Sequence, residues 1–255
     1  MTSFGGIDIG SSTAKFLLVD AQGVIVAKAM KRSGTDYGKT AEELLADVCS
    51  QAGCETEAVA KVISTGYGRD NVLWSTGTMT EIACHGKGAF FHYRQALTII
   101  DIGAQDSKVI HLDDQGRRTG FKMNRKCAAG TGAFIEEVAH RLAIDINDLN
   151  TLAESSTDTV ELGSYCTVFA ATEVIEKIRA GVPVAAIVRG AFQSVARRIV
   201  EMDGVDGMLV VTGGVAAHNP VVATMLGEVF STGAVIAPDA QFTGAFGAAL
   251  FAAGL

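Results

Sequence analysis

Residues 7–23 read IDIGSSTAKFLLVDAQG, and residues 100–116 read IDIGAQDSKVIHLDDQG. Laid over one another without a gap, the two stretches are identical at eight of seventeen positions. Each starts as an apolar strand, turns at a glycine and continues as a second strand. Two unrelated hairpins rarely agree so well, so we interpret the pair as an internal duplication. The identical pairs are Ile7/Ile100, Asp8/Asp101, Ile9/Ile102, Gly10/Gly103, Lys15/Lys108, Asp20/Asp113, Gln22/Gln115 and Gly23/Gly116.

The duplication predicts two similar α/β lobes, residues 1–96 and 97–255, with a last helix that can pack back on the first lobe. Apolar periodicity predicts the elements of both lobes. In the first lobe we expect strands at 4–9, 13–19, 24–29 and 62–65 and helices at 40–52 and 80–91. In the second we expect strands at 118–123 and 208–211, a short strand around Val235, and helices at 167–180, 184–202 and 243–253.

The composition excludes several classes of protein. A net charge of −7 and the lack of a Lys/Arg run argue against nucleic-acid binding. No signal peptide is evident, and no apolar stretch approaches the roughly 18 residues of a membrane helix. Five cysteines without close pairing argue against a secreted disulfide framework. We therefore expect a cytoplasmic protein without a membrane partner.

Each copy of the hairpin places an aspartate at a strand end, just before a glycine turn. Such turns point backbone N–H groups at phosphate. Two carboxylates there, Asp8 and Asp101, can hold Mg²⁺ through water and orient an attacking water molecule. Lys15 is expected to neutralise phosphate charge, and Gln105 to orient the water. We predict Asp8, Asp101 and Gln105 as the catalytic residues.

A third feature is the stretch NRKCAAGTGAFIEE at residues 124–137. Its Gly-Thr-Gly turn opens a helical pattern, so we expect free N–H groups and a positive helix end suited to a nucleotide phosphate. Cys127 lies three residues before that turn. A later glycine pair follows another strand and is expected to contact the adenosine. The predicted ATP-binding residues are Gly10, Ser11, Ser12, Thr13, Ala14, Lys15, Gly103, Ala104, Gln105, Gly130, Thr131, Gly132, Glu136, Gly213, Gly214 and Gln241.

The order IDIGSSTAK, IDIGAQDSK, TGG and GAFGAA resembles the actin, sugar kinase and Hsp70 ATPase superfamily. Within it, KCAAGTGAF and YCTVFA resemble the BadF/BadG/BcrA/BcrD-type ATPases, with GYGR at 66–69 and ACHG at 83–86 also matching. These ATPases include the activators of 2-hydroxyacyl-CoA dehydratases and the ATPase subunits of benzoyl-CoA reductase. The resemblance covers essentially the whole chain.

The resemblance implies two duplicated ribonuclease-H-like lobes, the actin-like ATPase fold, with the nucleotide cleft between them. It implies an ATPase that delivers a low-potential electron to a 2-hydroxyacyl-CoA dehydratase. The cofactors would be ATP or ADP, Mg²⁺ and a [4Fe–4S] cluster. Ferredoxin or flavodoxin is the expected electron donor by the same resemblance.

Cys127 and Cys166 are the two cysteines in a chemical context, because each precedes a predicted helix whose positive end favours a thiolate. Two ligands are too few for a [4Fe–4S] cluster, which takes four, so we expect one cluster shared across a homodimer. The resemblance implies the same arrangement. Buried free thiols are the alternative from spacing alone, and a Cys₄ zinc site is another. Cys49, Cys54 and Cys84 are interpreted as structural.

The chain departs from the usual pattern of this family at three positions. Ala104 stands where a second glycine is common, Arg125 stands where an aspartate precedes the cysteine, and Ala171 replaces an acid after Cys166. The last two changes remove negative charge near the proposed cluster, which favours its reduced state. Because they change the charge on a surface that faces the partner protein, they also leave the identity of that partner undetermined.

Several rival functions remain compatible with the sequence. The nearest is the ATPase subunit of a benzoyl-CoA reductase, and another is an activator of a double-cubane cluster reductase. A small-molecule kinase of the same fold would need an acceptor pocket and a catalytic base, and this chain has only short insertions. A filament or scaffold function would give no role to Cys127 and Cys166.

Overall fold

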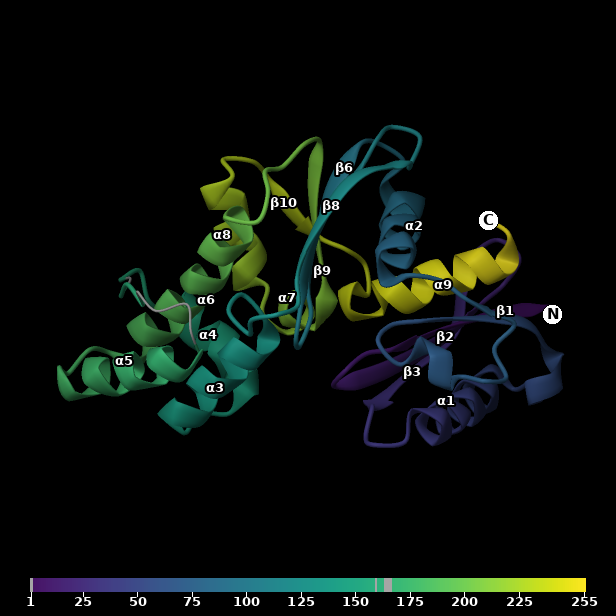
Figure 1. The fold of residues 1–255 in the computed structure, drawn as a ribbon, viewed down its shortest axis with the longest axis horizontal. Helices are drawn as coiled ribbons and strands as arrows, with labels where there is room; N and C mark the ends of the chain where they lie inside the picture. The colour runs from purple at the N-terminus through teal and green to yellow at the C-terminus, as the bar shows by residue number, and fades with distance from the viewer. Residues whose placement is uncertain (1, 159, 163–166) are drawn as a thin grey trace. The chain divides into compact units, whose positions relative to one another are not determined.

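Two five-stranded sheets organise the chain, each in its own unit of the computed structural model, which describes residues 2–158, 160–162 and 167–255 (Figure 1). Unit 1 consists of Met1–Gln95, Leu112–Arg118 and Gln241–Leu255. Unit 2 consists of Ala96–His111 and Thr119–Ala240. The end of the chain thus belongs to the same unit as its beginning.

The sheet of unit 1 has the strand order β3-β2-β1-β4-β5. β1 (Ser3–Ile9) and β2 (Thr13–Val19) form an antiparallel hairpin, and β3 (Ile25–Arg32) extends it, again antiparallel. β4 (Val59–Thr65) runs parallel to β1, and β5 (Gly77–Thr78) is a short parallel edge.

Alternation along the hairpin divides the core of unit 1 between the two faces of the sheet. Ile7 and Ile9 pack in the cluster that contains residues of α1 (Tyr37–Ala52), whereas Leu17 and Val19 pack against α9. Neighbouring side chains of a strand point to opposite faces, so one strand pair serves two apolar layers. The short connections are 3₁₀ turns at Thr56–Ala58 and Arg69–Asn71.

The helix α9 (Thr243–Ala253) lies very close to both α2 (Glu81–Tyr93) and the sheet, and the two helices meet at an angle in Figure 1. A Cβ atom on Gly247 would overlap the carbonyl group of Cys84 in α2. A Cβ on Gly6 in β1 would overlap the backbone of α9 at Ala245 and Ala249. Glycine is required at both places by this close backbone approach.

The sheet of unit 2 has the order β10-β9-β6-β7-β8. This is the order of unit 1 read from its other edge, β5-β4-β1-β2-β3, so each strand has an equivalent in the other sheet. It consists of β6 (Leu97–Ile102), β7 (Ser107–Leu112), β8 (Arg118–Asn124), β9 (Met208–Thr212) and β10 (Ala234–Ile236), and β9 is parallel to both β6 and β10. The predicted duplication is therefore present in the fold as well as in the sequence.

The helices of unit 2 enclose a core centred on α6. Phe192, Val195 and Ile199 of this helix are fully buried with Phe134, and the apolar strands β6 and β9 contribute to the same cluster. The helices are α3 (Gly132–Leu142), α4 (Leu149–Glu154), α5 (Thr167–Arg179), α6 (Val184–Val200), α7 (Gly213–His218) and α8 (Val221–Val229), with 3₁₀ turns at Ile146–Asp148 and Ala240–Phe242.

The predicted elements exist, and the differences lie at their ends. The first helix begins at Tyr37 rather than residue 40, because the Asp36 side chain accepts a hydrogen bond from the backbone N–H of Lys39 and caps it. The stop at Gly53 is confirmed by its left-handed backbone, with φ of 65°. Apolar periodicity missed the helices α4, α7 and α8 and the two-residue strand β5. Within the described residues, no helix combines the length and the apolar character needed to cross a bilayer.

We predict that Gly247→Ala lowers the free energy of unfolding by about 2 kcal/mol or more, because the added methyl group must push α9 away from α2. Urea denaturation followed by circular dichroism measures this. Gly233→Ala is the matched control, since a Cβ there meets no atom within 4 Å. Equal midpoints for the two variants would contradict the close packing of these helices.

Candidate active site

The first half of the predicted site lies at the end of the β1–β2 hairpin in unit 1. Asp8 is paired in register with Lys15, and its carboxylate oxygen Oδ2 lies 3.9 Å from the Lys15 Nζ. The backbone N–H of Gly10 donates to the Thr13 carbonyl at 3.1 Å and closes the turn. The Ser33 hydroxyl donates to the Gly10 carbonyl at 2.6 Å and holds the turn against β3.

Two glycines allow other segments of unit 1 to approach Asp8 closely. Gly66 follows β4 with φ of +91°, and a Cβ there would overlap Asp8 Oδ1 and the Ile9 carbonyl. Gly244 is the second residue of α9, and both Asp8 Oδ2 and His85 Nε2 lie 3.0 Å from the position of its absent Cβ. Asp8 is consequently only 7% exposed, although it ends a strand.

The second half of the site is centred on Asp101, at the end of β6 in unit 2. The Thr212 hydroxyl donates to Asp101 Oδ1 at 3.0 Å, and the Lys108 ammonium donates to Oδ2 at 3.1 Å. Lys108 also donates to Asp106 Oδ1 at 2.8 Å. Asp101 and Lys108 are each 3% exposed. A buried charge needs such partners, and here both oxygens of the carboxylate have one.

The glycine turn after β6 is joined directly to the beginning of α3. The backbone N–H of Gly132 donates to the Gly103 carbonyl at 2.9 Å, and that of Ala133 donates to the Ala104 carbonyl at 2.8 Å. The N–H of Thr131 donates to Ala128. The sequence led us to expect free N–H groups here. In the structure these three already have acceptors: those of Gly132 and Ala133 bond to the other glycine turn, and that of Thr131 bonds within its own loop.

The third glycine turn joins the same cluster. Gly213 begins α7 with φ of +92°, and a Cβ there would lie 2.7 Å from Asp101 Oδ1 and overlap the Ile102 carbonyl. Gly214, its neighbour, is partly exposed. Three segments that are far apart in the sequence therefore meet at Asp101 within one unit.

Cys127 lies in a tightly bonded loop between β8 and α3. The Asn124 side-chain amide donates to the carbonyls of Cys127 at 3.1 Å and Ala129 at 3.0 Å, and the Ser107 hydroxyl donates to the Gly130 carbonyl. The Cys127 thiol is free and partly exposed, which suits a metal ligand. The helix begins only at Gly132, so the cysteine is further from it than we expected. Cys166 lies outside the described residues.

The remaining predicted ATP-binding residues differ in their exposure to solvent. Ser11, Gln105 and Glu136 are exposed, as expected for side chains that meet a ligand. Ala14 has its side chain fully buried in the core, so only its backbone is available. Gln241 belongs to unit 1.

The sequence missed four polar residues around the two aspartates: His85 near Asp8, and Asp106, Lys108 and Thr212 at Asp101. Lys108 was within reach of sequence reasoning, because it matches Lys15 in the duplication. Thr212 precedes the glycine pair, and its contact depends on the parallel pairing of β6 with β9.

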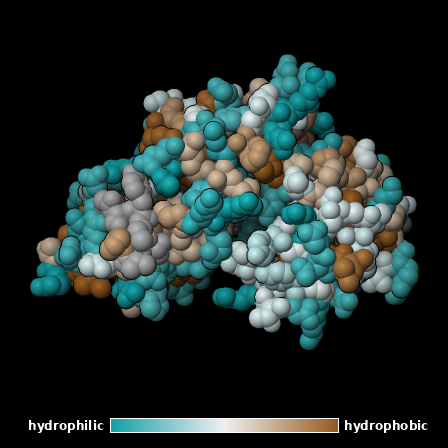
Figure 2. Space-filling model, in the orientation of Figure 1, coloured by the Kyte–Doolittle hydropathy of each residue, from teal (hydrophilic) through white to brown (hydrophobic). Residues whose placement is uncertain are grey.

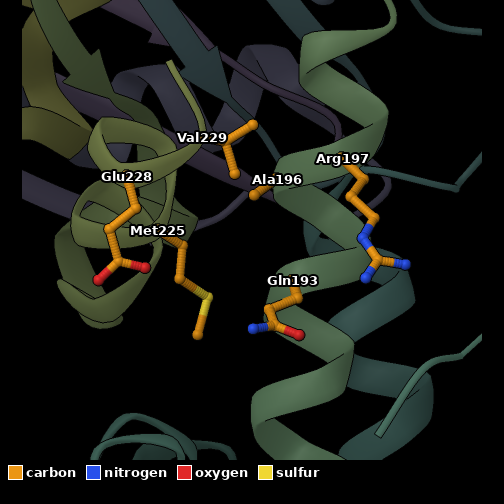
Figure 3. A pocket seen from close by; sticks show the side chains of 6 residues that line it. All are labelled: Gln193, Ala196, Arg197, Met225, Glu228 and Val229. Atoms are coloured by element: carbon orange, nitrogen blue, oxygen red, sulfur yellow. The ribbon is translucent and has the colours of Figure 1, made fainter. Parts of the chain in front are cut away.

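A small hollow elsewhere in unit 2, of about 150 Å³, lies between α6 and α8 (Figure 3). Its lining consists of Gln193, Ala196, Arg197, Met225, Glu228 and Val229. None of the predicted site residues within the described ranges lines it, so it is separate from the aspartate sites.

Two repeated strand–glycine–strand units, each with a buried aspartate and a lysine opposite it, define an ATPase of the two-lobed α/β type. The chain belongs to the BadF/BadG/BcrA/BcrD ATPase family, whose model matches residues 6–252. The activator of lactoyl-CoA dehydratase from Anaerotignum propionicum is 41% identical over 251 residues, which are 97% of this chain and 96% of that protein. A benzoyl-CoA reductase component from Thauera aromatica is 31% identical over 265 aligned residues, covering 99% of this chain and 94% of that protein.

Solved structures agree with this assignment. The activator of 2-hydroxyisocaproyl-CoA dehydratase from Clostridium difficile with bound ADPNP has a TM-score of 0.93 at 36% identity, covering 99% of this chain and 94% of that one. A ROK family glucokinase from Streptomyces griseus has a TM-score of 0.57 at 16% identity, covering 99% of this chain and 100% of that one, and shares the fold alone.

We predict that iodoacetamide labels Cys127 at least about tenfold faster than Cys49 or Cys84 in native, metal-free protein at pH 8. Burial raises the pKa of the Cys84 thiol to about 12, and burial together with the neighbouring Cys54 raises the pKa of Cys49 to about 11. Both thiols are therefore almost entirely protonated and unreactive at pH 8. Peptide mass spectrometry after timed quenching measures the rates.

Unfolding in urea is the control, because it should bring the three rates together. Labelling of Cys84 as fast as Cys127 in the native protein would contradict the burial of Cys84.

Proposed function

We propose that this chain hydrolyses ATP to pass one low-potential electron to a 2-hydroxyacyl-CoA dehydratase. The observation that supports this most is the bonding between α3 and the second glycine turn. In one unit, the segment that carries Cys127 is hydrogen-bonded through Gly132 and Ala133 to the turn that follows Asp101. A change at a phosphate-binding turn is thereby linked to a metal-ligating loop.

ATP is proposed to bind as its Mg²⁺ complex to both halves of the site. Asp8 and Asp101 would hold the metal through water, and Lys15 would neutralise phosphate charge. Gln105 would orient the water whose oxygen bonds to the γ-phosphorus, while the bond to the bridging oxygen breaks and the proton passes to solvent. The Gly213-Gly214 turn would contact the adenosine. The buried, hydrogen-bonded state of Asp101 suits this use, since its carboxylate is held in one orientation.

A [4Fe–4S] cluster is proposed to be held by Cys127 and Cys166 of two chains in a homodimer. When bound, the cluster supplies one-electron transfer at low potential. The partly exposed Cys127 thiol is compatible with this role, and α5, which begins after Cys166, exposes large apolar side chains at Phe169, Ile175 and Ile178. Figure 2 shows hydrophobic surface where Figure 1 places α5. An apolar surface of this kind suits a contact with a second subunit.

The chain's own residues would connect hydrolysis to electron transfer. Loss of the γ-phosphate would release the turn at Gly103 and Ala104, and α3 would follow because its first N–H groups are bonded there. The loop of Cys127, tied by Asn124 and Ser107, would move with the helix. A ferredoxin or flavodoxin in the cytoplasm is the proposed donor.

A benzoyl-CoA reductase is the second candidate partner. It is favoured by the similarity to the Thauera aromatica reductase component, at 31% identity against 41% for the lactoyl-CoA dehydratase activator. The chemistry proposed for this chain is the same in both cases. Purification of an active homodimer supports the dehydratase activator, whereas a requirement for a second, similar chain supports the reductase.

We predict that Asp8→Asn and Asp101→Asn each lower kcat for ATP hydrolysis by at least about a hundredfold, because each removes one charge from the proposed magnesium site. Phosphate release at saturating MgATP measures this, with iron content as the control that should stay unchanged. Turnover at the wild-type rate in both variants would show that the aspartates do not serve hydrolysis.

We predict that Cys127→Ser and Cys166→Ser lose the cluster but still bind MgATP. Iron and acid-labile sulfide per dimer, determined on protein purified without oxygen, should fall from about four of each to near zero. Cys54→Ser is the matched control, because Cys54 lies in unit 1 among core residues. Full iron in both variants would reject the ligand assignment.

A further inference from the structure

The two lysines at equivalent positions of the duplication, Lys15 and Lys108, have different surroundings. Each stands on the second strand of its hairpin, and each approaches the aspartate at the end of the first strand. The turns between them are closed in the same way. Gly10 N–H donates to the Thr13 carbonyl at 3.1 Å, and Gly103 N–H donates to the Asp106 carbonyl at 2.9 Å. The two turns therefore have the same backbone hydrogen bond, and they differ in the side chains around it.

Lys15 is the loosely held member of the pair. Its Nζ lies 3.9 Å from Asp8 Oδ2, which is beyond hydrogen-bond distance, and it has no hydrogen bond to any described residue. Its side chain is 13% exposed. The Nζ lies 3.5 Å from the point where a Cβ of Gly10 would be. A cation with unused donors thus stands over the first glycine turn.

Lys108 is held from two sides. Its Nζ donates to Asp101 at 3.1 Å and to Asp106 at 2.8 Å, and its side chain is 3% exposed. Over the second turn, the group next to the position of the absent Cβ of Gly103 is the Asp106 carboxylate, at 2.9 Å. The two turns therefore present opposite charges above equivalent glycines.

The cause of this difference is one residue. Asp106 occupies the position that Thr13 has in the first copy. A second carboxylate draws the Lys108 ammonium into the buried pair, where its charge is balanced and its hydrogen bonds are satisfied. Without that carboxylate, Lys15 keeps donors for an incoming anion. A phosphate oxygen is the class of ligand that such a lysine binds.

We propose that the duplicated lysines have separate tasks: Lys108 does not share the phosphate contact proposed above for Lys15 but is a positioning residue that holds the Asp101 carboxylate in place. The first turn then contributes a cation for phosphate, and the second turn contributes carboxylates for metal and water in addition to the phosphate contact proposed above. This inference rests on the assignment of Asp8 and Asp101 to the ATP site under Proposed function. Loss of Lys15 should affect binding, and loss of Lys108 should affect turnover.

The test separates KM and Kd from kcat in single variants. Lys15→Met should raise the Kd and KM for MgATP by about tenfold or more, because a charge-assisted contact with phosphate is lost. Lys108→Met should lower kcat by about ten- to a hundredfold, with Kd within about threefold of wild type. Lys61→Met is the matched control, since Lys61 is exposed on β4 and outside the site. Calorimetry gives Kd, and phosphate release gives kcat and KM.

A reciprocal exchange keeps the test decisive if Lys108→Met fails to fold. Thr13→Asp gives the first hairpin the residue of the second and should draw Lys15 into a buried pair, raising Kd by about tenfold or more. Thr13→Asn has the same shape without the charge, and the difference between these two variants reports the effect of the added carboxylate on Lys15 and on the phosphate. Asp106→Thr should release Lys108 and lower kcat while Kd is not weakened.

The outcomes distinguish this inference from the function on which it rests. If Asp101→Asn hydrolyses ATP like the wild type, the ATP-site assignment fails. If Asp101→Asn is inactive but Lys108→Met and Asp106→Thr turn over normally, only the positioning role fails. The same shift in Kd for Lys15→Met and Lys108→Met, with kcat unchanged in both, would also overturn the division of tasks.

Discussion

The charge-assisted hydrogen bonds to the Asp101 carboxylate are the interaction on which unit 2 depends. Thr212 brings the end of β9 to one oxygen, Lys108 brings β7 to the other, and Gly213 lets α7 begin beside Oδ1. A carboxylate buried without such partners would be strongly unfavourable. The pairing of β6 with β9 and the positive φ of Gly213 therefore both support one buried charge.

The first copy of the hairpin achieves a similar result by different means. Asp8 is enclosed by backbone rather than by hydrogen-bond donors from a neighbouring strand, since Gly66 and Gly244 let their segments approach without side chains. The ammonium group of Lys15 lies 3.9 Å from Asp8 Oδ2, without a hydrogen bond to any described residue. Duplication conserved the strand, the turn and the aspartate, while the supporting contacts diverged. Two halves with one ancestor can in this way contribute different chemistry to one reaction.

Much of the fold was predictable because it follows from repeated local patterns. The alternation in residues 7–23 and 100–116 indicated both hairpins, and helical spacing indicated α3, where Phe134, Ile135 and Val138 are buried. Contacts between distant segments were not predictable from one sequence. The bond from Gly132 to Gly103 consumes an N–H that looked available, and Thr212 reaches Asp101 only through sheet pairing. Local propensity contains no information about either partner.

The position of α9 has a consequence for how the chain folds as it is made. This helix covers one face of the β1–β2 hairpin, where Leu17 and Val19 pack against Ala245 and Leu250. In the chain, however, it follows the whole of unit 2. Unit 1 therefore lacks the apolar layer that α9 forms on this hairpin until synthesis has passed residue 253. Until residues 243–253 are made, the apolar face of this hairpin has no helix to cover it and must be kept from aggregating.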